Sequence, residues 1–249
     1  MAVKITRLPQ PASPTIDQVF DRFLDEQRRR LRSRTLSKYE DVLGLLSTYL
    51  NGYAYQGLPT AEAALFDRYY DAQGDEHLEF CQLFGPDKIV ANLGGFLGYF
   101  MIRKVWVGQE LKRAAGTVTK KLSTWLAAQG YVAEHEAQEG ADLGGEAARN
   151  LPKAERAARI LYDATADLAL DANDLSDDFL EFDHLTIVKV EAGRLWLERL
   201  DRGTMRSYGP IPVPVAATKL LRNGWDVSCA LARVDGIWRI VEVANVYPG

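Results

Sequence analysis

The sequence predicts an α+β fold, in which an N-terminal bundle of four or more helices is followed by a small antiparallel β module. Hydrophobic residues recur every three or four positions up to about residue 170, which is the period of an amphipathic helix. After Phe179 they alternate, which is the period of a strand. An Asp-Gly pair at 235–236 then separates two alternating runs, as in a two-residue β-hairpin.

Composition places the chain among ordinary globular proteins. It has 249 residues, of which 47% are hydrophobic and 26% charged, and its net charge of −4 excludes a chain that is basic throughout. Its two cysteines, Cys81 and Cys229, stand far apart, which excludes a disulfide framework and predicts a cytoplasmic location. The N-terminus has no signal-peptide core, and no run approaches the roughly 20 apolar residues of a membrane span, so no membrane partner is expected.

Charge is distributed unevenly along the chain. Residues 1–130 carry 17 Lys and Arg against 14 Asp and Glu, whereas residues 131–178 carry 4 against 12. Residues 179–249 carry 9 against 8. The acidity therefore comes from one middle segment, and the first half is weakly basic, an asymmetry that indicates more about partners than the total does.

The first half predicts an extended arm and then a helical domain over residues 15–132. The arm, residues 1–14, contains three prolines. Thr15 is the predicted N-cap of the first helix, and Ser33 is the predicted N-cap of a second helix that reaches Tyr53. One or two short helices are expected over residues 54–85.

Two further helices are predicted in this domain. Pro86 stands where a third helix begins, and a fourth runs from about Gln109 to a stop at Gly130. The third helix contains three glycines, which predict the close approach of a neighbouring helix; they are Gly94, Gly95 and Gly98.

Residues 133–178 are expected to be an acidic linker with one helix. The stretch 133–150 is polar, acidic and glycine-bearing, which is typical of a linker. Pro152 predicts the start of a fifth helix over roughly 153–170, and residues 171–178 (DANDLSDD) predict a loop.

The β module is expected over residues 179–249, with four or five strands in a curved or barrel-like sheet. One hairpin turns at residues 191–193 and the other at Asp235-Gly236. An extended segment and a short helix separate the hairpins. Three tryptophans alternate with polar residues and are expected in the core of the module: Trp196, Trp225 and Trp238.

Hydrophobic and basic spacings across residues 14–132 carry a resemblance to a known family. They are Phe20, Phe23 and Leu24; the segment from Leu31 to Leu36 with Tyr39; Phe96-Leu97 and Ile102-Arg103-Lys104; and the segments 118–122, 125–126 and 130–132. This pattern resembles the N-terminal SAM-like core-binding domain of tyrosine recombinases, the phage-integrase family. The chain departs from it in the thirty or so residues between the second and third helices and in the glycines of the third.

The resemblance implies a domain that clamps duplex DNA through basic helix ends, while a separate catalytic domain cuts the strand. That catalytic domain has no counterpart here, because none of the three histidines is followed three residues later by arginine, as the family motif requires. Tyr247 lacks the partners of a nucleophile and is expected to pack in the β module. We therefore expect a protein that is not an enzyme and has no catalytic residues.

The residues that this resemblance makes candidates for DNA contact are basic. Six of them fall within the eleven residues from Arg28 to Lys38, at the turn between the first two helices. Arginine offers a forked donor to phosphate oxygens, and a helix N-terminus adds backbone N–H groups. The candidates are Arg28, Arg29, Arg30, Arg32, Arg34, Lys38, Arg103, Lys104, Lys112, Arg113, Lys120 and Lys121.

A plainer interpretation of the basic run stays open. Asp25 and Glu26 lie at helical spacing from the arginines and can pair with them, which would make the run a solvated helix edge. The alternative to DNA binding is then an adaptor or structural protein, which uses the bundle and the β module for contact with another protein. The acidic middle segment favours that alternative.

No metal or cofactor is expected. His135 and Glu139 are four residues apart, but no second histidine or cysteine is near them. The segment DANDLSDD begins like a calcium loop but has Ser176 at position six and Phe182 at position twelve, where glycine and glutamate are needed. The glycines of the third helix do not have the spacing of a phosphate-binding loop.

Overall fold

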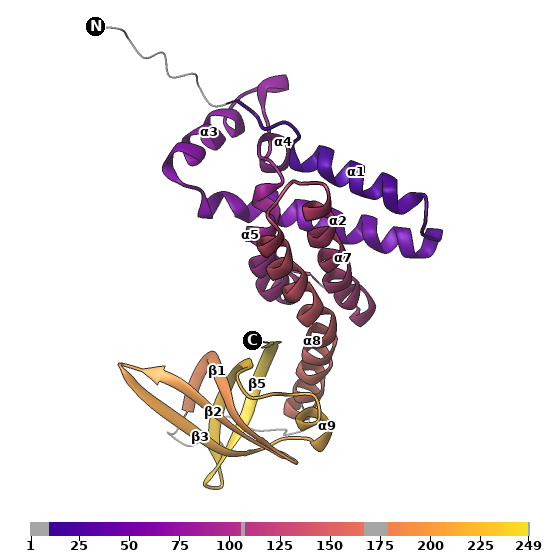
Figure 1. Ribbon diagram of the computed structural model, residues 1–249. Helices are drawn as coiled ribbons and strands as arrows, with labels where there is room; N and C mark the ends of the chain where they lie inside the picture. Colours follow the sequence, from indigo (N-terminus) through magenta and orange to yellow (C-terminus); the bar gives the residue numbers. More distant parts are fainter. Residues whose placement is uncertain (1–9, 106–107, 167–178, 249) are drawn as a thin grey trace, which may run out of the picture. The chain divides into compact units, whose positions relative to one another are not determined.

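The computed structural model describes residues 10–105, 108–166 and 179–248 (Figure 1). They form two compact units, each assembled from two segments of the chain. The helical unit comprises Met1–Phe96 and Ala114–Gly145, and the sheet unit comprises Leu97–Arg113 and Glu146–Gly249. The predicted α+β class is confirmed, since helices precede a five-stranded antiparallel sheet. The two units are interleaved along the chain, whereas the sequence predicted consecutive domains.

The helices before the sheet follow the predicted order, with more short elements than expected. Most of the predicted arm lies outside the described residues. None of the described helices is both long and apolar enough to cross a membrane. The elements are α1 (Ile16–Arg28), α2 (Ser33–Tyr53), η1 (Ala54–Gly57), α3 (Thr60–Tyr70), η2 (Gly74–Glu76), α4 (Phe80–Leu83), α5 (Asp87–Gly95), the π-helical turn η3 (Phe96–Phe100), α6 (Met101–Arg103), α7 (Gln109–Ala128) and α8 (Glu134–Ala166).

The N-terminal caps of α1 and α2 differ. Thr15 caps α1 as predicted, in a capping box where its hydroxyl accepts from the N–H of Gln18 at 3.3 Å and the Gln18 side chain accepts from the N–H of Thr15 at 3.2 Å. The prediction that Ser33 caps α2 is wrong. Arg32 occupies the N-cap position with extended backbone, and its side chain makes no capping hydrogen bond. Ser33 is already the first helical residue.

The glycines around α5 are only partly explained by close packing. A Cβ at Gly95 would lie 2.0 Å from the hydroxyl oxygen of Tyr49 on α2, so the predicted close approach is confirmed there. A Cβ at Gly94 or Gly98 would have nothing within 4 Å among the described residues, and the prediction is wrong for both. Gly130, with φ +72°, follows the end of α7 as predicted.

The predicted linker is helical. Residues 133–150 belong almost entirely to α8, which runs without interruption from Glu134 to Ala166. Its first turn carries Glu134 and Glu136, whose negative charge suits a helix N-terminus. Buried residues, most of them alanine or glycine, then recur every three or four positions along it: Ala137, Gly140, Ala141, Gly144, Ala147, Leu151, Ala154, Ala157, Ala158 and Leu161.

Pro152 does not begin a helix, as predicted, but lies inside α8. A proline within a helix removes one backbone hydrogen bond and is normally destabilising. Its neighbours Leu151 and Ala154 are both buried, so packing on either side of the proline holds the helix together. The loop predicted over residues 171–178 lies outside the described residues.

The sheet has the order β3-β2-β1-β4-β5, with every neighbouring pair antiparallel. Both predicted hairpins are confirmed, and the sheet is strongly curved (Figure 1). Its edge strands meet, because the ring of Tyr208 on β3 lies edge-on to that of Trp238 on β5, with centroids 5.2 Å apart. The strands are β1 (Phe179–Glu191), β2 (Arg194–Asp201), β3 (Thr204–Pro212), β4 (Asp226–Val234) and β5 (Ile237–Tyr247), with the short helix α9 (Val215–Thr218) after β3.

The core of the sheet unit combines the strands with the C-terminal half of α8. Ala154, Ala157 and Leu161 of the helix belong to the same buried cluster as residues of all five strands. Trp225 is buried in this cluster and Trp238 packs against it, as predicted. Trp196 is half-buried, with the Lys189 ammonium 4.4 Å from its ring centroid.

Candidate nucleic-acid interface

The turn between α1 and α2 carries the basic run and is the strongest candidate for an interface. The two helices pack through the stacked rings of Phe23 and Tyr39, whose centroids are 6.0 Å apart. Gln27 is buried beside the turn, and its side-chain oxygen accepts hydrogen bonds from the Arg30 guanidinium, one of them 2.9 Å from Nε. Burial raises the pKa of Tyr39, and the nearby Arg30 opposes this effect. The packing therefore fixes the geometry of the turn.

Arg28 is engaged by carboxylates. Its guanidinium lies 2.5 Å from Asp25 and 3.5 Å from Glu40, so the pairing that the plainer interpretation expected is present for this arginine. All three side chains are about half exposed, and such pairs contribute little to stability. They nevertheless place negative charge against Arg28, which weakens it as a phosphate contact.

Arg29 and Arg32 have a different environment. Both are exposed, and neither forms an ion pair within the part of the chain that the structure describes. Arg32 is also the N-cap of α2, and the first turn of this helix contains no acidic residue. No side chain caps the helix, so the partial positive charge of its N-terminus adds to that of the two arginines, which lie next to it in the sequence. We call Arg29, Arg32 and the first turn of α2 the arginine corner.

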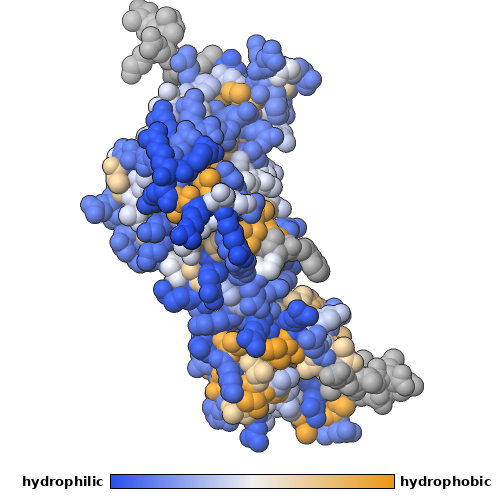
Figure 2. Space-filling view, turned by 90° about the vertical axis from the view of Figure 1, so that its right-hand side faces the viewer, coloured by the Kyte–Doolittle hydropathy of each residue, from blue (hydrophilic) through white to orange (hydrophobic). Residues whose placement is uncertain are grey.

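Arg34 and Lys38 extend from the arginine corner along α2. Arg34 is exposed and Lys38 half-buried, and both have interaction partners within the structure. Figure 2 faces the end of the α1–α2 hairpin and shows the most hydrophilic colouring gathered over it, around a small hydrophobic area. The corner therefore belongs to a strongly polar surface.

α7 places two of the predicted lysines in the same unit. Trp125 of α7 packs against Phe23 of α1 with ring centroids 5.3 Å apart, and its indole N–H donates to Glu26 at 2.8 Å. The hydrogen bond therefore engages Glu26, which the plainer interpretation expected to pair with the arginines. Lys120 and Lys121 lie on α7 and are exposed.

The remaining four candidates belong to the sheet unit: Arg103, Lys104, Lys112 and Arg113. Lys112 is a poor candidate for DNA contact, because its side chain is 5% exposed and its ammonium pairs with Glu155. Arg103, Lys104 and Arg113 are exposed. The twelve predicted residues therefore divide between two units, with eight in the helical unit.

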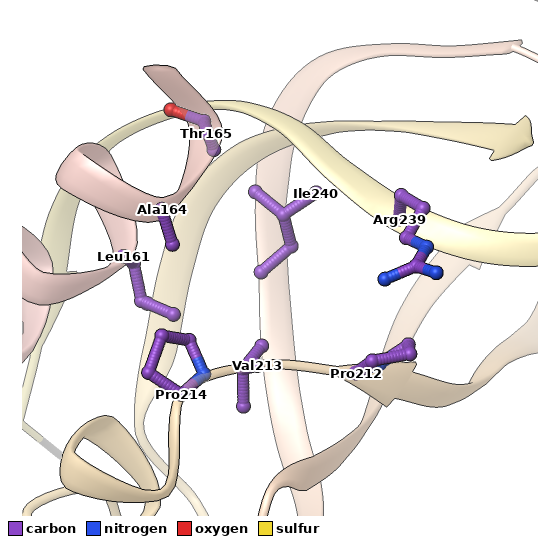
Figure 3. Close-up of a pocket in the computed structure, with 8 residues that line it drawn as sticks. All are labelled: Leu161, Ala164, Thr165, Pro212, Val213, Pro214, Arg239 and Ile240. Carbon is purple, nitrogen blue, oxygen red and sulfur yellow. The ribbon is translucent and has the colours of Figure 1, made fainter. Parts of the chain in front are cut away.

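Other candidate sites are weaker. No group of three metal-ligating side chains occurs within residues 10–105, 108–166 and 179–248. The segment DANDLSDD lies outside these ranges. A crevice of about 240 Å³ in the sheet unit is mostly apolar, with Arg239 as the charged residue among those that line it (Figure 3).

Tyr247, considered above as a nucleophile, lies at the end of β5. Its ring contacts that of His184 with centroids 5.0 Å apart. Its hydroxyl is buried without a hydrogen-bond partner among the described residues. No base among those residues, His184 included, is therefore hydrogen-bonded to the hydroxyl to accept its proton.

Comparison with known proteins adds no relative: no family model, no curated protein and no solved structure matches the chain.

The uncapped N-terminus of α2 could not be foreseen from the sequence, since Ser33 is itself a good N-cap residue. The arginine corner thus depends on the geometry of the turn.

Proposed function

We propose that the protein binds duplex DNA through the arginine corner and does not cut it. The observation that carries the proposal is that two features favourable to phosphate binding occur together at this turn. Two exposed arginines, which form no ion pair among the described residues, lie beside an uncapped helix N-terminus that has no acidic residue in its first turn. Forked guanidinium donors and a helix N-terminus both suit phosphate oxygens. The resemblance to the core-binding domain of tyrosine recombinases supports duplex DNA as the source of the phosphates.

The contacts available at the corner predict weak binding with little sequence preference. Phosphate contacts position a protein on DNA but carry no sequence information by themselves. Exposed Lys120 and Lys121 on α7 add two further cations of the same unit. Binding that rests on such contacts must weaken steeply as salt rises, because each contact releases condensed counterions.

The test measures the affinity for a short fluorescent duplex by anisotropy over a series of salt concentrations. The test variant is Arg29→Gln with Arg32→Gln. The matched control is Arg156→Gln with Arg194→Gln, which removes the same charge from two exposed arginines of the sheet unit. The slope of log affinity against log salt should become shallower by about 0.9 for each phosphate that the test variant no longer neutralises. The control should keep the wild-type slope.

Two results would refute the proposal. Absence of binding at low salt removes DNA as the partner. An unchanged slope in the Arg29 and Arg32 variant removes the arginine corner as the site, even if DNA binds.

The ion pairs of Arg28 favour a second function, contact with another protein. Asp25 and Glu40 make the outer edge of the hairpin a mixed-charge surface, which is typical of polar rims in protein interfaces. A chain that fails to bind duplex DNA at low salt but associates with a protein partner through this hairpin would support the adaptor function.

A further inference from the structure

The sheet unit contains a cavity of about 580 Å³ that the proposed function does not use. Its walls come from α6, the start of α7, the C-terminal half of α8 and β5. The residues that line it are Ile102, Arg103, Val105, Lys112, Glu155, Ala158, Arg159, Tyr162, Ala244 and Asn245. This volume falls within the roughly 300 to 1,000 Å³ of small-molecule sites.

The lining is positively charged. Three cations, Arg103, Lys112 and Arg159, stand against one carboxylate, Glu155, a net charge of +2. Arg103 and Arg159 are exposed and form no ion pair within the described residues. Two guanidinium groups are therefore available to an anion that enters the cavity.

Lys112 forms a buried donor in the same wall. Its side chain is 5% exposed, and Glu155 accepts a hydrogen bond from its ammonium. An ammonium has three N–H donors, and Glu155 is the partner that the described residues provide. Lys112 and Glu155 therefore neutralise each other, and the net positive charge of the lining comes from Arg103 and Arg159.

The rest of the lining is apolar, apart from the Asn245 amide. Ile102, Val105, Ala158 and Ala244 form it, and Tyr162 adds an aromatic ring that is 61% exposed. An exposed aromatic ring beside cations is suited to stack on a flat group whose charged end reaches the arginines.

We propose that this cavity binds a phosphate monoester with a flat apolar body, the class to which mononucleotides belong. A phosphate monoester carries a charge of about −1.5 to −2 at pH 7, which matches the net charge of the lining better than the −1 of a carboxylate. The guanidinium groups of Arg103 and Arg159 bind the phosphate, and Tyr162 stacks on the flat body. This proposal does not rest on DNA binding, since the arginine corner belongs to the other unit.

The experiment titrates adenosine monophosphate into the full chain and measures heat by calorimetry. Three comparison ligands are used. Adenosine lacks the phosphate, ribose 5-phosphate lacks the flat body, and benzoate is a flat body with a carboxylate in place of the phosphate. We expect adenosine monophosphate to bind saturably. Its affinity should be at least tenfold higher than that of each comparison ligand.

Variants then locate the site. Arg159→Gln should lower the affinity for adenosine monophosphate by roughly tenfold to a hundredfold, the usual effect of losing a hydrogen bond to a charged group. Tyr162→Ala should lower the affinity for adenosine monophosphate but leave the affinity for ribose 5-phosphate unchanged. Arg156→Gln, an exposed arginine on the same helix that does not line the cavity, should leave the affinity unchanged. Melting curves verify that each variant is folded.

Several outcomes overturn the proposal. No saturable heat at millimolar adenosine monophosphate means that the cavity does not take this class of ligand. Equal affinity for adenosine shows that the cations take no part, and preferential binding of benzoate assigns a carboxylate instead. Equal weakening by Arg159→Gln and Arg156→Gln places any binding outside the cavity.

Discussion

Gly144 should be the glycine at which alanine is most damaging in the helical unit. It is buried on α8, where a Cβ would lie 2.6 Å from the backbone N of Lys120 and 2.7 Å from the carbonyl oxygen of Gly116, both on α7. The third neighbour is the hydroxyl of Thr119 at 2.8 Å. Because two of these atoms are backbone, no side-chain rotation can relieve the contact.

The magnitude follows from two opposing terms. Alanine is favoured over glycine inside a helix by about 1 kcal/mol. Against this, the helices must separate until the closest contact grows from 2.6 Å to the 3.4 Å of ordinary packing. Overpacking of this kind costs about 1 to 3 kcal/mol, and rigid neighbours place Gly144 at the upper end. The net loss of unfolding free energy is then about 2 kcal/mol, or roughly 4 to 8 °C in Tm for a chain of this size.

Thermal unfolding followed by circular dichroism measures this difference. Gly94→Ala is the matched control, since Gly94 also lies within a helix, α5, but its Cβ position has nothing within 4 Å. That variant should gain up to about 1 kcal/mol. If Gly144→Ala melts at or above the wild-type temperature, α7 and α8 do not constrain each other as the geometry requires.

Three further outcomes are expected. Burial raises the pKa of both Cys81 and Cys229 to about 12, so neither thiol should react with Ellman's reagent at pH 8 until denaturant is added; rapid modification of the native chain would contradict this burial. Tyr247→Phe removes a buried hydroxyl that has no partner among the described residues and should raise the unfolding free energy by about 1 kcal/mol, whereas a loss of stability in a denaturant titration would reveal a hydrogen bond. Burial and two nearby carboxylates raise the pKa of Asp17 above its ordinary 3.8, so the folded state favours the protonated form. Asp17→Asn should therefore be more stable than the wild type at pH 7 by up to about 1 kcal/mol, and the difference should close as the pH falls below 3.8; a difference that does not change with pH would exclude this cause.

The elements built from large apolar residues could be predicted from the sequence, and the one built from small residues could not. The stripes on α1 and α2 contain Phe, Leu and Ile, so their period is plain. The buried face of α8 consists mostly of alanine and glycine over residues 134–150, and these contribute little to a hydrophobic pattern. Its glycines resemble those of a linker, yet Gly140 and Gly144 are where α8 meets its neighbours most closely.

The two hairpins of the sheet could be predicted because their signals are local. Asp235 and Gly236 both have positive φ, of +50° and +78°, which the Asp-Gly pair is suited to adopt. The contact between β3 and β5, which curls the sheet, joins Tyr208 to Trp238 and has no local signal. For the same reason the cavity of the sheet unit could not be foreseen, since its walls come from three stretches far apart in the chain, residues 102–112, 155–162 and 244–245.

The twelve basic residues show that charge alone does not define an interface. Arg28 and Lys112 carry the same charge as Arg29 and Arg32, but carboxylates engage the first two and no ion pair engages the others within the described residues. A phosphate can gain little from a cation that already has a carboxylate at its side, because it must compete for the same donors. Residues available for anion binding are therefore recognised by what surrounds them: the uncapped first turn of α2 at the arginine corner, and the open cavity beside Arg159 in the sheet unit. Both environments depend on the fold, and this is why the basic run by itself left DNA contact and a solvated helix edge equally open.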